Sequence, residues 1–161
     1  SPCLQLDNGS VVAEVTLICS YLDEITDGPS LIGATPEERA ETRMWLRRLD
    51  VRILEPMSLA FRSAEALEVF KSRCHVIPQA ANDPKATVQE SWVWLEPQMA
   101  GKQYICGKRF TLADIQLFVF ADFGAMIGQG IPEGLPNLQA WFNRITARPS
   151  LAASLHPSKF A

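Results

Sequence analysis

The spacing of hydrophobic residues changes near Glu14, and this change divides the chain into a short β-prone start and a long helical remainder. Before Glu14, the β-prone runs 3–6 and 10–12 flank Asp7-Asn8-Gly9, and Asn-Gly is the strongest short-range signal for a β-hairpin. After Glu14, apolar residues recur at steps of three and four, which places them on one face of a helix ending near residues 27–29. These residues are Val15, Ile18, Leu22 and Ile25.

A hairpin and a single helix bury too little apolar surface to fold alone. We therefore expect residues 1–28 to be the closing part of a larger domain.

A second helical segment begins at Thr35, where the sequence carries a complete capping box. Thr35 stands at the cap, Pro36 at the first helical position and Glu38 at the third. The pattern predicts a long helix whose apolar face continues at steps of three or four. Pro56 lacks an amide donor and should kink this helix near Arg52 without ending it. The apolar face consists of Leu46, Leu49, Ile53, Met57, Ala60, Ala64 and Leu67.

Proline and glycine mark the ends of the later helices. Asp83-Pro84 repeats the cap-then-proline arrangement and predicts a helix that ends at Gly101. Residues 136–147 form an amphipathic segment, and a short final helix follows Arg148. The glycine-rich residues 128–134 are interpreted as a loop, because they follow a helix and lack the Lys-Ser/Thr ending of a phosphate-binding loop.

Composition favours a globular protein with one sizeable core: 47% of the 161 residues are hydrophobic and 20% are charged. A net charge of -3 gives no basic footprint for nucleic acid. The sequence shows neither an apolar run of membrane-spanning length nor the pattern of a signal peptide, so we expect no membrane contact and a cytoplasmic location. The four cysteines lack metal-ligand spacing, which predicts reduced thiols and no metal site.

The most informative motif is the run from Gly107 to Asp114, which leads into the almost wholly apolar residues 115–120. Thr111 and Asp114 can form a reciprocal capping box, and Phe110 and Ile115 stand where a hydrophobic staple would pack. Such an apolar helix must be buried. The pattern G-x-x-F-T-x-A-D-I closely resembles the buried helix start in the all-helical half of cytosolic glutathione transferases.

This resemblance implies the fold. Pro2 through Leu22 looks like the part of a glutathione transferase that runs from the cis-proline through the last hairpin and helix of its thioredoxin-like domain. The implied fold class is α+β and mostly α, with the end of a thioredoxin-like glutathione-binding domain at residues 1–28 and an all-α domain at residues 35–161. In the family, a Ser, Tyr or Cys on the opening strand and helix activates the glutathione thiol. No position of this sequence corresponds to it, so the catalytic residue is expected upstream of residue 1.

The glutathione-binding residues are also implied by the resemblance. Ser1 precedes the presumed cis-proline Pro2, and in the family the backbone at that position pairs with the cysteinyl part of glutathione. Glu14 and Val15 match the acidic-or-Gln then Ser pair that grips the γ-glutamyl group. Glu14 can pair with its ammonium group, whereas Val15 offers only a backbone amide and the helix N-terminus, which favours an anion. The alternative is that Glu14 is merely an acidic residue favoured in a first helical turn.

Residues 56–65 look like a stretch found in some bacterial-type members of the family, whose helices there wall the acceptor-substrate pocket. Met57 and Phe61 share a helix face at four-residue spacing and are predicted to line that pocket, although such residues also commonly form core. Arg62 and Glu65 are three apart and are expected to form a helical ion pair.

The resemblance as a whole implies a homodimeric glutathione transferase, in which the glutathione thiolate attacks a hydrophobic small-molecule electrophile. Glutathione is then a co-substrate and no cofactor is required. The competing hypothesis is a non-catalytic glutathione transferase-like module that mediates protein association, because one scaffold supports several functions.

Overall fold

The computed structural model describes residues 2–154 and places a small β-hairpin and one helix against an all-helical bundle. Strands β1 (Cys3–Gln5) and β2 (Val11–Ala13) pair antiparallel, with Leu4 opposite Val12. Gly9 has a φ of 81° and donates its amide to the carbonyl of Leu6, which closes the turn. The predicted hairpin at Asn8-Gly9 is therefore confirmed, and so is the fold class. The proposed domain limits at residues 28 and 35 stay a prediction.

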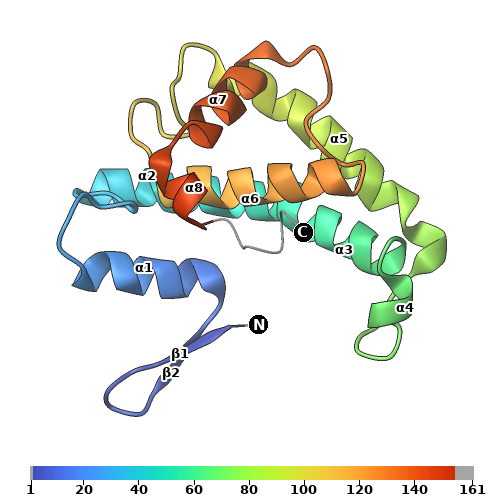
Figure 1. Cartoon of the computed structure of the whole chain (residues 1–161), viewed down its shortest axis with the longest axis horizontal. Helices are drawn as coiled ribbons and strands as arrows, with labels where there is room; N and C mark the ends of the chain where they lie inside the picture. The colour runs from blue at the N-terminus through green and yellow to red at the C-terminus, as the bar shows by residue number, and fades with distance from the viewer. Residues whose placement is uncertain (1, 155–161) are drawn as a thin grey trace.

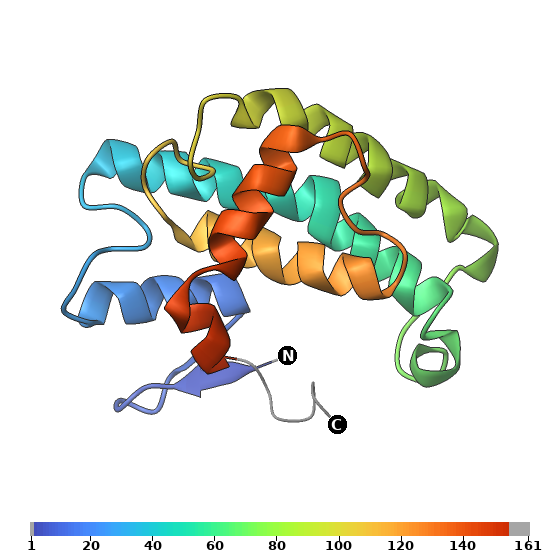
Figure 2. The ribbon, with the colours of Figure 1, turned by 45° about the horizontal axis from the view of Figure 1, so that its top comes forward.

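Helices make up most of the remaining described chain. Figures 1 and 2 show α6 beside the continuous run of α2 and α3, α5 along α3, α7 crossing the bundle, and α1 with the hairpin on one side. The helical elements are α1 (Val15–Ile25), α2 (Pro36–Leu49), the π-helix η1 (Asp50–Leu54), α3 (Glu55–Ser63), α4 (Leu67–Phe70), the 3-10 helix η2 (Pro78–Ala80), α5 (Asn82–Leu95), the 3-10 helix η3 (Glu96–Met99), α6 (Leu112–Met126), α7 (Pro136–Thr146) and α8 (Pro149–Ser154).

The bundle encloses one core. Trp92 and Trp141 are its largest fully buried side chains, and they meet leucine and isoleucine side chains from the helices around them. Met57 and Leu117 are also completely buried. Helix α1 has no buried side chain. The core that stabilises the described chain therefore comes mainly from the helices after residue 35, with Ile32 and Ile105 added from the connecting segments.

The long helix from Thr35 is irregular where the proline predicts it. Its cap forms as expected, because the Thr35 hydroxyl accepts a hydrogen bond from the Glu38 amide and the Glu38 carboxylate accepts one from the Thr35 amide. Near Pro56 the backbone widens into the π-helix η1, in which the amide of Glu55 donates to the carbonyl of Asp50. A proline leaves the carbonyl four residues earlier without its usual donor, and the wider turn accommodates this mismatch.

Two helix boundaries differ from the sequence prediction. The long helix was predicted to continue through Leu67 but ends at Ser63, because the buried Ser63 hydroxyl accepts the Ile77 amide where the chain turns back toward α5. Helix α5 begins at Asn82, so Asp83 lies within its first turn and does not act as the cap. Its terminal turn changes to the 3-10 helix η3, and Gly101 follows with a φ of 71°.

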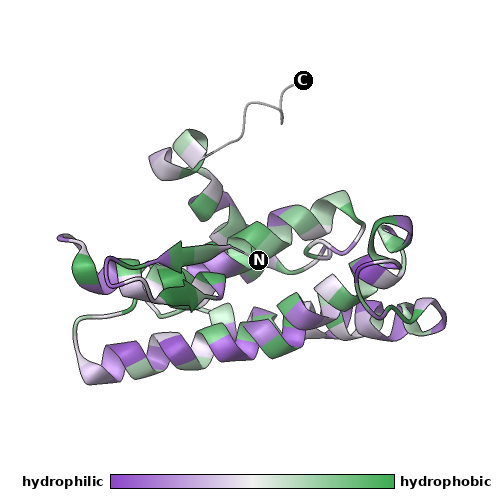
Figure 3. Cartoon of the chain, turned by 90° about the horizontal axis from the view of Figure 1, so that it is seen from below, coloured by the Kyte–Doolittle hydropathy of each residue, from purple (hydrophilic) through white to green (hydrophobic). Residues whose placement is uncertain are grey.

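The hairpin side of the molecule exposes much apolar surface. Figure 3 views this side, where green, hydrophobic segments are interspersed with purple, hydrophilic ones along the hairpin and α1. Val15 is 55% exposed and Ile25 is 61% exposed, although the sequence pattern places both on one apolar helix face. The two ends of this face are therefore exposed, whereas Ile18 between them is half-buried.

Candidate functional site

Glu14 joins the hairpin to α1 in a backbone conformation that non-glycine residues rarely adopt. Its φ is 70° and its ψ is 119°, and it is the one non-glycine residue with positive φ in residues 2–154. The Glu14 carbonyl accepts the amides of Leu17 and Ile18, which begins the helix. Its exposed side chain makes no hydrogen bond to a described residue. Such strained positions cluster at functional sites, so Glu14 is a candidate ligand-binding residue.

Val15 follows at the first position of the same helix. The first amides of a helix have no partner within it, and they carry the positive end of the helix dipole. The structure therefore brings the Glu14 carboxylate and the anion-favouring amide of Val15 to one exposed corner beside the hairpin. Pro2 is exposed near the same strand pair, whereas Ser1 and its bond to Pro2 lie outside the described residues.

Asp23 fixes the far end of α1 to the segment that enters the bundle. Its carboxylate accepts the Ser30 hydroxyl at 2.7 Å, the Leu31 amide at 2.6 Å and the Ile32 amide at 3.1 Å. Partial burial acts to raise the pKa of Asp23, but these hydrogen bonds prevail and hold it below its ordinary value. The carbonyl of Leu31 in turn accepts the Leu112 amide at the start of α6. The position of Glu14 relative to the bundle depends on this connection.

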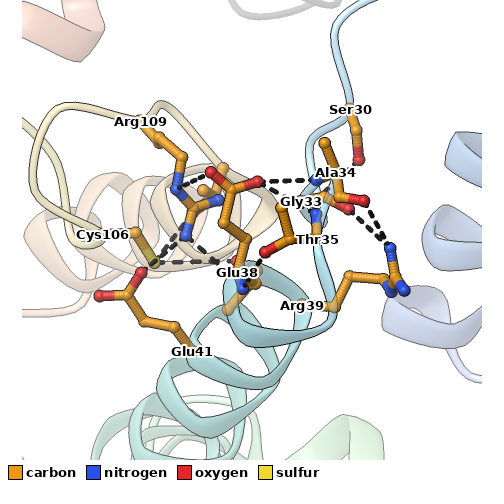
Figure 4. A network of polar contacts seen from close by, with 11 residues as sticks. Ser30, Gly33, Ala34, Thr35, Glu38, Arg39, Glu41, Cys106 and Arg109 are labelled. Carbon is orange, nitrogen blue, oxygen red and sulfur yellow. Dashed lines mark hydrogen bonds and ion pairs between the residues drawn. The ribbon is translucent and has the colours of Figure 1, made fainter.

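A network of charged side chains anchors the start of α2 to the loop before α6, as Figure 4 shows. Arg109 pairs with Glu41 at 2.7 Å and with Glu38 at 3.6 Å. The Ala34 amide and then the Thr35 amide hold the pKa of Glu38 below its usual range. All members of this network are paired, so we interpret it as a structural junction that holds the linker after α1 in place.

A second candidate site lies around the π-helix and α3. An open cleft of about 660 Å³ is lined by η1, α3 and the start of α5, with Phe120 of α6 on its wall. A smaller pocket of about 310 Å³ adjoins it and shares Ser58, Arg62 and Phe120. In Figures 1 and 2, the first turn of α1 is the end of that helix nearer to α3. Both candidate sites thus lie toward one side of the molecule.

The two predicted pocket residues occupy different environments. Phe61 lines the smaller pocket, where its ring lies 5.0 Å from that of Phe123 and 6.3 Å from that of Phe70. Met57 has no exposed surface, and its methyl group packs close to Gly124 in the core. A ligand could contact Phe61 without any rearrangement, but it could contact Met57 only if the core opened.

The expected ion pair between Arg62 and Glu65 does not form. Glu65 pairs instead with Lys85 of α5, and α3 ends between Arg62 and Glu65, so they do not share a regular helix face. Arg62 makes no hydrogen bond or ion pair with any residue from 2 to 154, and it lines both pockets. Its role as a pocket residue was missed because spacing alone assigns it to Glu65.

Asp114 is completely buried and serves the fold. Its carboxylate accepts the amides of Thr111 and Ile105 and the Trp141 indole NH, each at 2.9 Å, and the Thr111 hydroxyl at 3.1 Å. The predicted capping box is therefore present. Burial raises the pKa of Asp114, and the hydrogen bonds oppose this shift.

Cys106 is a buried thiol and not an activated one. Cys106 is buried beside Thr42 and Thr111, and burial raises the pKa of its thiol, which disfavours the thiolate. All four cysteines are free. Residues 2–154 contain no group of three or more His, Cys, Asp or Glu side chains that could hold a metal ion. None of the helices described is long and apolar enough to cross a membrane.

Comparison with known proteins places this geometry in context. Residues 60–149 match the family described as the C-terminal domain of glutathione S-transferase. Glutathione S-transferase 2 of Saccharomyces cerevisiae is 28% identical over 155 residues, which cover 93% of this chain and 64% of the yeast protein. The chain thus spans less than two thirds of that relative's length.

A solved structure and a second curated protein extend the comparison. The crystal structure of a glutathione S-transferase domain-containing protein from Marinobacter aquaeolei VT8 superposes with a TM-score of 0.83 and 33% identity, and the match covers 94% of this chain and 74% of that one. Elongation factor 1-gamma of Schizosaccharomyces pombe is 26% identical over 155 residues, which cover 95% of this chain but 36% of the yeast factor.

Proposed function

The chain belongs to the glutathione S-transferase family, and from this premise we propose that it binds glutathione at the start of α1 for transfer to a hydrophobic electrophile. The observation that carries the proposal is the strained backbone of Glu14, whose carboxylate has no partner among residues 2–154 and lies beside the first amides of a helix. The γ-glutamyl end of glutathione has one ammonium and one carboxylate group. Glu14 suits the ammonium, and the Val15 amide suits the carboxylate.

In the proposed reaction, the glutathione thiolate forms a carbon–sulfur bond with the electrophile, whose leaving group departs with the electron pair. The thiol proton passes to solvent or to a base that we assign to no residue of this chain. Ser1 and Pro2 would contact the cysteinyl part of glutathione. Phe61 would line the acceptor pocket, with Met57 behind it in the core. Glutathione acts as a co-substrate, and no other cofactor is required.

The proposal includes a cytoplasmic homodimer. The four free cysteines fit a reducing compartment. Exposed Met44 and Val51 on the α2–η1 run, together with Val93 on α5, provide apolar surface that a second copy could cover.

A non-catalytic role in protein association is the second candidate. Two observations favour it: the match to elongation factor 1-gamma, and Val15 at a position where the resemblance implies a serine hydroxyl. Under this alternative the exposed apolar side chains of α1 would contact a protein, and glutathione would not bind.

Replacing Val15 tests the transferase proposal. Val15→Ser supplies the missing hydroxyl at an exposed position, so we expect glutathione to bind about threefold to tenfold more tightly, the scale of one added hydrogen bond to a charged group. Val15→Ala is the matched control, because it removes the same bulk without adding a hydroxyl. Calorimetric titration with glutathione measures all three proteins. Equal affinities for the serine and alanine variants would contradict the assigned role of this position, and no binding by any of them would favour the association module.

A further inference from the structure

The smaller pocket between α3, α4 and α6 is built mainly from aromatic rings. Four phenylalanines form a chain of edge-to-face contacts: Phe70 to Phe61 at 6.3 Å, Phe61 to Phe123 at 5.0 Å, and Phe123 to Phe120 at 6.3 Å. Aromatic rings prefer this arrangement because the positive edge of one ring meets the negative face of the next. The pocket volume of about 310 Å³ lies at the small end of the range for ligand sites. Its size and its lining suit one aromatic ligand.

Arg62 gives this pocket a positive edge. It follows Phe61 in α3, is half-buried, and lines both the aromatic pocket and the adjoining cleft. Its guanidinium has no acidic partner among residues 2–154, because Glu65 is engaged by Lys85. A guanidinium presents a planar fork of donors that matches a carboxylate. The free Arg62 therefore supplies a binding group for an anion.

The acidic residues nearby do not cancel this charge inside the aromatic pocket. Asp50 and Glu55 line the wider cleft but not the aromatic pocket, and both are paired with Arg47, at 2.8 Å and 3.2 Å. Asp83 lines the wider cleft from α5 but not the aromatic pocket. The wall nearest the rings carries Ser58 and Arg62 as its polar groups. A ligand anion that stays at the Arg62 edge avoids the acidic side of the cleft.

We propose that this pocket binds an aromatic carboxylate, with the ring against the phenylalanines that line the pocket and the carboxylate on Arg62. The inference rests on the proposed transferase function in so far as it names the class of acceptor: an aromatic electrophile that carries a carboxylate group. The rings supply affinity for any planar aromatic compound. Arg62 supplies the preference for an acid over a neutral analogue of the same shape.

A pair of ligands that differ only in charge tests this division of roles. 2-Naphthoate and 2-naphthamide share the same ring system, and their binding can be followed by ligand fluorescence and confirmed by calorimetry. We expect the parent protein to bind the acid about fivefold to tenfold more tightly, as for a charge-assisted hydrogen-bond pair at a partly exposed site. Equal affinities, a preference for the amide, or no binding of either compound would overturn the proposal.

Variants separate the contribution of the Arg62 charge to ligand affinity from that of the aromatic rings. Arg62→Gln should abolish the preference for the acid and leave the affinity for the amide unchanged. Phe123→Leu should weaken the binding of both ligands to a similar extent, because it removes an aromatic ring from the wall of the pocket but leaves that wall apolar. Arg48→Gln, which removes an exposed arginine of α2, is the matched control and should behave as the parent. Thermal melts by circular dichroism verify that each variant is folded. An acid preference that survives in Arg62→Gln would contradict the role of Arg62.

Failure of this inference can be distinguished from failure of the proposed function. Glutathione is absent from this titration, so a charge-selective aromatic pocket would support the inference even in a protein that fails to bind glutathione. Conversely, glutathione binding without discrimination between naphthoate and naphthamide would overturn the inference alone.

Discussion

Asp114 gathers donors from three separate parts of the chain: the loop at Ile105, the cap at Thr111 and the α7 residue Trp141. Asp114→Ala would leave all of them without an acceptor in a site closed to solvent. We expect a loss on the order of 3 kcal/mol in the free energy of unfolding, since each stranded donor is costly. Urea denaturation measures this loss. A midpoint equal to that of the parent would contradict the structural role.

The raised pKa of Asp114 predicts that the stability of the protein depends on pH. Burial raises the pKa of Asp114, so the folded state binds this proton more tightly than the unfolded state. Its contribution to stability is then fully present below the ordinary aspartate pKa and is lost as pH rises through the higher folded value. Asp114→Asn cannot titrate there. The stability advantage of the parent over Asp114→Asn should shrink as pH rises through this window, and an advantage that grows would refute the assignment.

Hydrogen-bond partners that are close in the sequence could be predicted, and distant ones could not. Thr111 and Asp114 are three apart, so a capping rule identifies them. Trp141 donates to Asp114 from 27 positions away, and no sequence spacing indicates this contact. Glu96 likewise caps α7 by accepting the amides of Asn137 and Leu138, 41 and 42 positions later. Such contacts depend on how the helices pack.

Among the elements, the start of α2 depends on a glycine that no other residue can replace without strain. Gly33 has a φ of 126°, and an added Cβ would lie 2.6 Å from the Glu38 Cβ and 2.8 Å from the Glu38 carbonyl carbon. Gly9 also has a positive φ, but its surroundings are open, so it is the matched control. We expect Gly9→Ala to cost about 1 kcal/mol and Gly33→Ala about 3 kcal/mol, because only the latter also displaces a helix. Equal shifts in the denaturation midpoint would contradict this account.

The elements themselves were largely predictable, since period and capping residues act locally. The hairpin, the α2 cap and the disturbance before Pro56 all follow from their own residues. The end of α3 at Ser63 does not, because it depends on a hydrogen bond to Ile77. Nor does the partner of Glu65, which comes from the neighbouring helix α5. Predictions of helix boundaries and ion pairs from the sequence are wrong where tertiary contacts determine them.

In the whole molecule, the candidate site combines residues that the sequence alone identifies with residues that only the packing of the helices brings together. Glu14 is adjacent in sequence to the hairpin and to α1, so the resemblance could identify it. Phe70, Phe120 and Phe123 join Phe61 only after α4 and α6 pack against α3, and their spacing in the sequence equally suits core residues. Met57 shares a helix face with Phe61 but is fully buried. Periodicity identifies a face but does not show how far along it the core extends.

Calorimetric titration of the protein with glutathione, compared between the parent and Glu14→Ala, is the decisive experiment for the glutathione site. Glu24→Ala is the control, because it removes an exposed carboxylate on the same helix, away from the first turn. We predict that the parent binds glutathione, that Glu24→Ala binds it equally well, and that Glu14→Ala loses about 1 kcal/mol or more, roughly a fivefold weakening. A parent that does not bind glutathione, or an affinity unchanged by Glu14→Ala, would contradict the proposed glutathione site.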